Sequence, residues 1–480
     1  MTAPEERAQP RPLSEKVGPL LLLLALSLVR GLLYLAIIPP WQGPDEPRHF
    51  EYARLIADRG RLVTKRDLSP ALQEGVIRSM VEHDFWRFGF AYYGYDPARP
   101  PQAFEEIWPG DFAHQVHQPP LYYIGAALAA RLAPGDDVQA DLYAMRLYSL
   151  FLGLLTLIVI YRAAGELFPE DPALRLAIPA FVALLPMRTF LTSMVSNDNL
   201  AELLVSMLLW RAVRLIRLGL TPGRALEVVL WAGVSVFSKL TALVAIPLAL
   251  LALLLASGIP WEDAAARGRA LRRLGAGAGS LAAIGALLLF SAGSAHPLWS
   301  APGRFLRIPR EAALYLMGGD YARALLATPY GTYLTVMFRS FWGLFGWLNV
   351  PMASAAYGLL GGATAVVALG LARGFLRARR TRALPPWQWR ALWLCALSPI
   401  LAIVIVLGKE VLFLTYLEGG LPHGRYLFPV IFPIATLFTL GLRAWMPASR
   451  RTAFLVGLLA GLFLLDAWAL WGTVIPFYYG

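Results

Sequence analysis

Two adjacent carboxylates, Asp45 and Glu46, lie between Pro44 and Pro47 just after the first hydrophobic segment of the chain. A membrane helix would give way to water at this position, so the pair suggests chemistry at a membrane surface. The alternative is a solvated turn, because Asp favours turns and proline restricts the backbone beside it. Motifs further along the chain favour the first interpretation.

The composition places the chain among membrane proteins. Of its 480 residues, 57% are hydrophobic and only 15% are charged, which is more apolar sequence than a soluble core can bury. The net charge of +12 does not predict a nucleic-acid partner, because the basic residues lie in short clusters between apolar runs. The preference of Lys and Arg for the cytoplasmic side of a membrane explains such clusters. The single cysteine, Cys395, lies in an apolar run and is interpreted as a packing residue.

The apolar runs and the basic clusters together predict the topology. About 20 apolar residues cross the hydrocarbon layer, and loops rich in Lys and Arg stay in the cytoplasm. We therefore predict an all-α polytopic protein of the plasma (inner) membrane with about eleven spans, one domain over residues 1–480 and a cytoplasmic N-terminus. The predicted spans are 17–39, 139–163, 173–190, 194–216, 223–238, 241–257, 275–293, 351–372, 390–408, 424–445 and 452–472.

Two apolar runs are left out of this count. Residues 119–133 reach only about 22 Å as a helix, less than a hydrocarbon core of roughly 30 Å, so we interpret them as interfacial or re-entrant. Residues 334–348 receive the same interpretation. Counting 119–133 as a span would invert every later loop and place the arginine clusters outside. Three outer stretches then remain, at 40–138, 294–350 and 409–423.

The first outer stretch is long for a loop and rich in aromatic residues. Loops of this length are usually functional. The aromatic residues gather at 85–88, 92–95 and 107–108, a density typical of a membrane-interface belt or of a wall on which sugar rings stack. For any single ring we favour the interfacial belt.

Six short motifs resemble membrane-embedded GT-C glycosyltransferases, most closely the protein-mannosyltransferase and aminoarabinose-transferase branch and its uncharacterised bacterial relatives. Each motif alone is weak, and their order and shared outer placement carry the resemblance. The motifs are GPDEPRHFEYA (43–53), HQPPLYY (117–123), SND (196–198), SKLT (238–241), FWGLFGW (341–347) and HGRY (423–426).

The resemblance implies a GT-C-like helical bundle with a long first extracytoplasmic loop, and it implies a reaction. Such an enzyme moves a sugar from a polyprenyl-phosphate donor to a lipid, glycan or protein acceptor at the extracytoplasmic membrane face. We expect an inverting displacement with a carboxylate base. The expected partners are the lipid-linked donor, the acceptor and the bilayer.

The same resemblance assigns roles on the acceptor side. Asp45 is the expected base, because an alcohol is a poor nucleophile until its proton is removed. Glu46 would orient the acceptor or share the proton, and two close carboxylates push one pKa upward. His49, Tyr122 and Asp198 are expected to bind the acceptor or shape the site. For Asp198 the sequence itself favours a helix cap, because it lies in an Asn-Asp-Asn turn.

The leaving lipid phosphate develops negative charge and therefore needs fixed cations or donors nearby. We predict that Lys239, Arg425, Arg339 and His117 bind it. Each has an alternative explanation: Lys239 as an interfacial lysine whose charge reaches the headgroups, the two arginines in salt bridges with loop carboxylates, and His117 as a surface histidine.

A metal site is an alternative that we do not favour, and no cofactor is predicted. Glu46 and His49 have the i, i+3 spacing of carboxylate–histidine metal pairs, with His114 and His117 further along the loop. The branch that the chain resembles, however, does not rely on a DxD-type metal motif, and the first outer stretch contains none.

Three charges lie deep in predicted spans: Arg30, Glu202 and Asp466. Intramembrane charges normally face the bundle interior and pair, so we predict an Arg30–Glu202 ion pair. The same charges would serve a lipid or solute transporter, which is the main alternative function. The sequence shows no inverted repeat of the kind that many transporters carry. A lipid-linked glycan polymerase or ligase is a third candidate.

Overall fold

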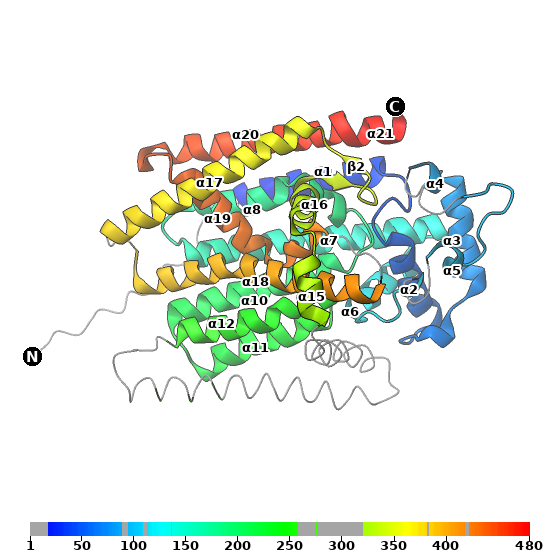
Figure 1. Cartoon of the computed structure of the whole chain (residues 1–480), viewed down its shortest axis with the longest axis horizontal. Coiled ribbons are helices and arrows are strands. Elements are labelled where there is room, and N and C mark those ends of the chain that lie inside the picture. Colours follow the sequence, from blue (N-terminus) through cyan, green and yellow to red (C-terminus); the bar gives the residue numbers. More distant parts are fainter. Residues whose placement is uncertain are drawn as a thin grey trace, which may run out of the picture.

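The long helices of the chain run side by side along the longest axis of the molecule (Figure 1). The structure, a computed structural model, describes residues 18–88, 95–108, 113–135, 137–257, 320–381, 384–417 and 422–480, with single positions at 268, 272 and 275. Several predicted features lie outside the described residues: the N-terminal segment 1–17, aromatic residues 92–94, the span 275–293 beyond its first residue, and positions 294–319 of the second outer stretch.

The lengthwise helices expose large apolar side chains. Leu22 on α1 is 72% exposed and Leu464 on α20 is 68% exposed. Isolated exposed leucines are ordinary, but continuous apolar faces mark surfaces that contact something other than water, as membrane helices do. The lengthwise helices are α1 (Gly18–Ile37), α7 (Val138–Leu167), α8 (Pro172–Leu184), α10 (Asp198–Leu218), α11 (Pro222–Val236), α12 (Ala245–Ala256), α17 (Ser354–Thr381), α18 (Pro386–Leu417), α19 (Ile431–Arg443) and α20 (Arg451–Ala469).

Among the described residues, six helical segments are long and apolar enough to cross a membrane. A seventh results if α8 and α9 (Pro186–Thr192), which are bent by 66°, count as one span. The bend falls at Leu185, whose ψ of 116° is extended, because the proline that follows disfavours the helical conformation. The all-α polytopic class is confirmed, and the number of about eleven spans stays a prediction.

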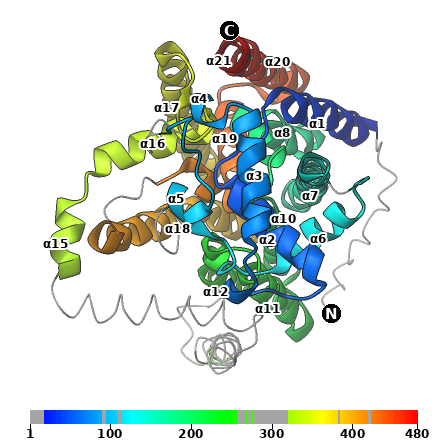
Figure 2. The ribbon, with the colours of Figure 1, turned by 90° about the vertical axis from the view of Figure 1, so that its right-hand side faces the viewer.

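The first outer stretch forms a cap over one end of the bundle (Figure 2). We call residues 40–135 the first-loop cap. Its buried apolar side chains, such as Phe50, Met80 and Phe104, belong to a cluster separate from that of the bundle. α6 has 11 residues, too few to span, and packs on α2 and α7. The cap contains α2 (Glu46–Arg59), η1 (Lys65–Asp67), α3 (Pro70–Glu82), α4 (Phe85–Phe88), α5 (Phe104–Ile107) and α6 (Leu121–Arg131).

Several shorter elements connect the lengthwise helices along the chain or follow the last of them. The run 334–348, predicted as interfacial or re-entrant, forms the end of α16 and the start of a small antiparallel hairpin. The predicted outer stretch 409–423 needs correction, because α18 continues as a helix to Leu417. The shorter elements are η3 (Leu240–Val244), α15 (Asp320–Ala327), α16 (Tyr330–Trp342), β1 (Leu344–Phe345), β2 (Val350–Pro351), η4 (Gly424–Val430), η5 (Ala448–Arg450), η6 (Leu470–Val474) and α21 (Ile475–Tyr479).

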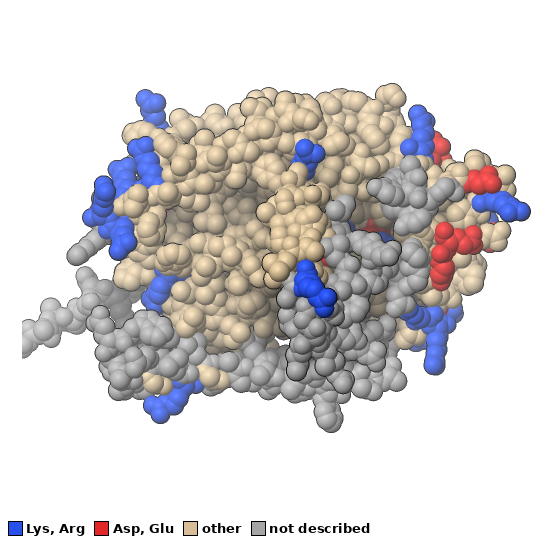
Figure 3. Space-filling model, in the orientation of Figure 1, with Lys and Arg blue, Asp and Glu red and all other residues tan. Residues whose placement is uncertain are grey.

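Charged side chains gather at the two ends of the molecule, and few lie on the middle of the face in Figure 3. Exposed arginines at one end come from α17 and the start of α20, including Arg379, Arg380 and Arg451. The first-loop cap at the other end exposes both signs, for example Glu74 and Arg78. A belt poor in charge between two charged ends fits a protein that spans a bilayer lengthwise.

The deep charges pair, but not as predicted. Arg30 pairs with Asp466, with its Nε 2.7 Å from Oδ2, while the Tyr34 hydroxyl donates to Oδ1 at 3.0 Å. Glu202 instead pairs with Arg188, whose Nε lies 2.6 Å from Oε1. The predicted Arg30–Glu202 pair was therefore wrong, because the bend before α9 brings a second arginine beside α10 that the sequence analysis did not consider.

Candidate active site

Asp45 precedes α2 in a left-handed backbone conformation, with a φ of 65°. Asp and Asn enter this region more readily than most residues with a side chain. The Asp45 carbonyl accepts hydrogen bonds from the N–H groups of Arg48 (3.1 Å) and His49 (3.0 Å). Its carboxylate makes no helix-capping bond and is directed at cations instead. The residue thus lies in a turn, as one alternative held, but it is half-buried and ion-paired rather than solvated.

The Asp45 carboxylate lies in a cluster of opposite charges. It pairs with Arg48 and with Arg425, whose Nη2 is 2.7 Å from Oδ2. Arg425 Nε lies 3.7 Å from Asp198, and Asp198 Oδ1 lies 2.7 Å from Lys239 Nζ. We call these five residues the Asp45 cluster. Three cations in it face two carboxylates.

Separate segments of the chain build the Asp45 cluster. Asp45 and Arg48 come from the start of α2, Asp198 opens α10, Arg425 lies in η4, and Lys239 lies in the break between α11 and η3. η4 packs against α10, α16, α18 and η3. All of these are helix ends or breaks, and irregular backbone at membrane depth is tolerated only where it is buried in protein or lines a cavity. The structure thus brings four predicted site residues together, while their roles in a reaction stay predictions.

Several buried polar atoms beside the cluster have no hydrogen-bond partner among the described residues. They are Nη1 of Arg425, Nε2 of His423, both amide atoms of Asn197 and Oγ1 of Thr241. His423 Nδ1 accepts from the Arg425 N–H at 3.1 Å, so Nε2 of the neutral ring carries the proton and is a donor. Leaving such groups unpaired costs about 1–3 kcal/mol each. A concentration of them at one place marks a site for a polar ligand or ordered water.

The charges around the start of α2 shift two pKa values downward. Burial alone would raise the pKa of Asp45, but the neighbouring Arg48 and Arg425 guanidinium groups outweigh it and hold the pKa well below its usual range. Burial also lowers the pKa of His49 to about 3, with Lys239 and both arginines adding to the effect of burial and Asp45 opposing it. His49 is therefore neutral near pH 7.

Glu46 points away from Asp45 and belongs to a different ion pair. Its carboxylate accepts from Arg146 Nε (2.9 Å) and Nη2 (2.7 Å) and from the Val195 N–H (3.0 Å). Arg146 also donates to the carbonyls of Ile38 (3.0 Å) and Pro39 (3.1 Å). Glu46 and Arg146 are both 0% exposed, so Glu46 does not reach an acceptor or share a proton with Asp45. The expected role of Glu46 is corrected to a structural one.

His49 and Tyr122 hydrogen-bond to residues around the Asp45 cluster rather than to its charged groups. His49 Nδ1 is 2.7 Å from the Tyr123 hydroxyl. The Tyr122 hydroxyl contacts Ser149 Oγ at 2.7 Å and accepts from the Ser196 N–H at 3.1 Å. Tyr122 therefore fixes the turn that presents Asn197 and Asp198. Burial raises the pKa of Tyr122, so it stays a neutral hydrogen-bonding group.

Arg339 and His117 are not among the residues of the Asp45 cluster. Arg339 is exposed on α16, and its guanidinium lies 5.2 Å from the centre of the Tyr357 ring. His117 is half-buried, with Nε2 3.1 Å from Gln118 Nε2. The expected grouping of Arg339 with the other phosphate ligands is corrected, because α16 directs this side chain outward.

The metal alternative finds no support in the described part of the chain, where no group of three or more His, Cys, Asp or Glu side chains is arranged to hold an ion. Glu46 binds Arg146, His49 contacts Tyr123, and His114 lies between Glu51 and Glu105. Independence from metal stays a prediction.

A family of predicted membrane proteins, DUF2142, matches residues 28–435. The chain belongs to this family. Among solved structures it is similar to ArnT from Cupriavidus metallidurans bound to undecaprenyl phosphate, with 16% identity over 97% of this chain and 74% of ArnT and a TM-score of 0.41. No curated protein sequence matches it significantly.

Two further solved structures are similar to this DUF2142 chain. The Archaeoglobus fulgidus oligosaccharyltransferase shares 15% identity over 97% of this chain, with a TM-score of 0.48. Arabinosyltransferase EmbB from Mycobacterium smegmatis shares 13% over 98%, with a TM-score of 0.40. The chain covers 56% and 38% of these two proteins.

In this DUF2142 chain, sequence reasoning missed two residues of the Asp45 cluster or its surroundings, Arg48 and Tyr426, and one residue of the neighbouring structural pair, Arg146. Arg48 lies inside the first motif and pairs with Asp45. Arg146 lies within a predicted span, so the rule that deep charges pair would have found it. Tyr426 lies next to Arg425, and its ring centre is 4.4 Å from Lys409 Nζ and 5.7 Å from Lys239 Nζ. Tyr426 belongs to the HGRY motif, but nothing in the sequence predicted that its ring would lie among cations.

Proposed function

We propose that the chain is a membrane glycosyltransferase that moves a sugar from a polyprenyl-phosphate donor to an acceptor hydroxyl. The observation that supports this most is the Asp45 cluster, in which a carboxylate, an excess of cations and unpartnered donors occupy one buried place. Transfer to a hydroxyl requires those two elements, a base for the acceptor and fixed positive charge for the leaving phosphate.

The phosphate of the donor would bind to Arg425 and Lys239. Nη1 of Arg425 has no partner among the residues that the structure describes, and Lys239 carries its charge on a flexible stem. The proton on His423 Nε2 supplies a further donor beside Arg425. The hydroxyl of Thr241, two residues after Lys239, is also without a partner among the described residues. A donor phosphodiester with one negative charge would balance the one cation that the two carboxylates leave over.

Donor binding would also activate Asp45. In the ion-paired state its pKa is well below the usual range, which makes it a weak base. A phosphate that engages Arg425 competes for this guanidinium and raises the pKa of Asp45. The base would therefore gain strength only when the donor is bound, which suppresses proton abstraction in its absence.

The orientation follows from the charged ends. The end that exposes arginines of α17 and α20 would face the cytoplasm, and the N-terminus would lie on that side. The first-loop cap and the Asp45 cluster would then face the extracytoplasmic side of the plasma membrane. The reaction would proceed without metal, as an inverting displacement in which Asp45 accepts the acceptor proton.

A transfer assay with the purified full-length protein tests the proposal. A panel of synthetic polyprenyl-phosphate sugars would be incubated with lipid, glycan and peptide acceptors, and products identified by mass spectrometry. Transfer of at least one sugar that is lost in Asp45→Asn supports the proposal. No transfer to any acceptor, together with flux of a solute into proteoliposomes, would favour a transporter instead.

The variant Asp58→Asn provides a matched control. Asp58 lies on the same helix as Asp45 but is 42% exposed and pairs only with Arg54 among the described residues. Its substitution removes the same charge outside the cluster and should leave the rate unchanged.

A further inference from the structure

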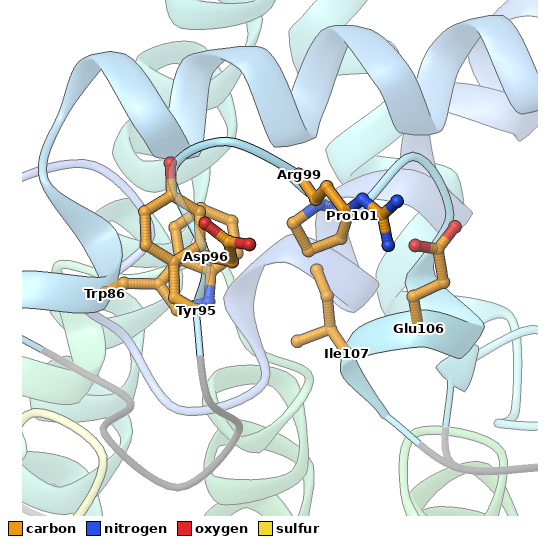
Figure 4. A pocket seen from close by; sticks show the side chains of 7 residues that line it. All are labelled: Trp86, Tyr95, Asp96, Arg99, Pro101, Glu106 and Ile107. Atoms are coloured by element: carbon orange, nitrogen blue, oxygen red, sulfur yellow. The ribbon is translucent and has the colours of Figure 1, made fainter.

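The first-loop cap contains a small pocket made by residues other than those of the Asp45 cluster (Figure 4). Its volume is about 240 Å³, and its lining includes Trp86, Tyr95, Arg99 and Glu106. Sites for drug-sized ligands run from about 300 to 1,000 Å³, so this pocket suits a single small unit rather than a lipid chain.

One wall of the pocket is a rigid aromatic stack. The Trp86 and Tyr95 rings lie parallel, with centroids 4.4 Å apart and an interplanar angle of 16°. Trp86 also meets Phe85 edge to face at 5.2 Å, and Phe85 is fully buried in the cap. Trp and Tyr offer large flat surfaces at a low cost in conformational entropy. The stack therefore gives the pocket a fixed aromatic surface.

Arg99 and Glu106 lie across the pocket from the stack, whereas Asp96 lies beside the stack (Figure 4). One oxygen of Asp96 accepts from the Ala98 N–H at 2.9 Å, and one oxygen of Glu106 accepts from the Gln102 N–H at 3.3 Å. The other carboxylate oxygens and the Arg99 guanidinium have no hydrogen-bond or ion-pair partner among the described residues. Carboxylates accept two hydrogen bonds side by side and guanidinium donates two. Neighbouring hydroxyl groups match both patterns.

We propose that this pocket binds one sugar ring. A pyranose or furanose offers an apolar face to the Trp86–Tyr95 stack and hydroxyl groups to Asp96, Arg99 and Glu106. A phosphate is disfavoured, because two carboxylates face one cation. This binding needs no transfer reaction and therefore stands apart from the proposed function.

Trp108 connects the pocket to the Asp45 cluster, because it follows a residue of the pocket and contacts Arg48. Ile107 lines the pocket, and the next residue, Trp108, lies with its ring centre 5.1 Å from the Arg48 guanidinium. Arg48 in turn pairs with Asp45. In a transferase, a sugar held here would belong to a glycan acceptor, and this role rests on the proposed function.

Binding would be tested with the full-length protein in a detergent without a sugar headgroup, using methyl glycosides of glucose, mannose, galactose, arabinose and N-acetylglucosamine. Saturation-transfer NMR and tryptophan fluorescence would report binding. We expect at least one glycoside to bind, Trp86→Ala and Arg99→Gln to weaken its binding at least about tenfold, and Trp86→Phe to retain most of it. Arg99 is exposed, so its substitution should not affect folding.

The controls separate this proposal from the proposed function. Arg78→Gln removes another exposed arginine of the cap and should leave binding unchanged. Asp45→Asn should also leave it unchanged, even where transfer is lost. No binding of any glycoside, or binding that survives both Trp86→Ala and Arg99→Gln, would overturn the assignment.

Discussion

Asp45 and Glu46 are neighbours in the chain but belong to two different kinds of ionic site. The Glu46–Arg146 pair is fully buried, and Arg146 uses its remaining donors on main-chain carbonyls. The Asp45 cluster is largely buried too, but polar atoms of Arg425, His423 and Asn197 beside it have no hydrogen-bond partner in the part of the chain that the structure describes. The difference shows that burial of a charge does not by itself mark a functional site. What distinguishes the candidate site is incomplete hydrogen bonding.

The largest expected effect comes from breaking the complete pair. Arg146→Met leaves the Glu46 carboxylate buried without its cation, so the free energy of unfolding should fall by about 3–5 kcal/mol. Thermal unfolding in detergent would measure the loss. The double variant Glu46→Gln/Arg146→Met should recover much of it, because the uncompensated charge is gone. If Arg146→Met were as stable as the natural protein, the Glu46–Arg146 pair would not be the structural pair that its complete hydrogen bonding indicates.

The incomplete site should respond in the opposite way. Asp45→Asn should lower the transfer rate by about 10²- to 10⁴-fold, the usual contribution of general base catalysis. The backbone should tolerate the change, because Asn also adopts the left-handed conformation. The melting temperature should fall less than in Arg146→Met, because the Asp45 side chain is 21% exposed and Arg425 keeps Asp198 as a counter-charge. Initial rates and melting curves would be measured on the same preparation. Full activity in this variant would exclude Asp45 as the base.

The cations of the cluster should govern donor binding. Arg425→Gln or Lys239→Gln removes a charged hydrogen bond worth about 1.5–3 kcal/mol, so the Kd for a polyprenyl phosphate should rise by roughly 10- to 100-fold. Arg339→Gln is the matched control, because Arg339 is exposed over Tyr357. Equal losses of affinity in all three variants would contradict the structure, which places Arg339 apart from Arg425 and Lys239.

The pH dependence of stability should differ in sign between two histidines. The folded pKa of His49 is about 3, below an unfolded value of about 6.5, so its contribution is present above pH 6.5 and is lost as the pH falls toward 3. The slope should not exceed about 1.4 kcal/mol per pH unit. Unfolding of His49→Gln from pH 4 to 7 should show a flatter profile than the natural protein.

His114 should give the smallest effect. Burial would lower its pKa, but hydrogen bonds and charges from Glu51 and Glu105 outweigh burial and raise it. Its contribution is therefore present below the unfolded pKa and is lost as the pH rises through the raised folded value. Melting curves between pH 6 and 9 should show a loss no larger than about 1 kcal/mol, absent in His114→Gln. A gain in stability with rising pH that depends on His114 would contradict the geometry.

The sequence predicted which residues of the Asp45 cluster come together better than it predicted how their side chains are arranged. Asp45 and Asp198 were named because the chain resembles GT-C glycosyltransferases at their motifs, and Lys239 and Arg425 because a leaving phosphate needs cations. The divergence of Asp45 and Glu46 was not predictable, since it depends on a positive φ at Asp45 and on Arg146, 100 residues away from Glu46.

The helical class was predictable because long apolar runs have few alternatives in a membrane. Local features set by distant contacts were not. α18 continues through Lys409 and Glu410, two charges that pair with each other at 3.0 Å and that sequence reasoning took for the start of a loop. Likewise Arg188 and Glu202 find each other only because the chain bends at Leu185.

Arg146 donates hydrogen bonds to the residues just after α1, and this link should make the candidate site sensitive to bilayer thickness. α1 has 20 residues, about 30 Å of helix, which equals the hydrocarbon thickness of an average bilayer. Arg146 ties the carbonyls of Ile38 and Pro39 to Glu46, next to Asp45. The depth of the Asp45 cluster in the bilayer should therefore follow the length of the first helix, and bilayers of longer or shorter acyl chains should shift the cluster relative to the headgroups. Reconstitution in a series of acyl-chain lengths should show turnover greatest where the bilayer matches α1.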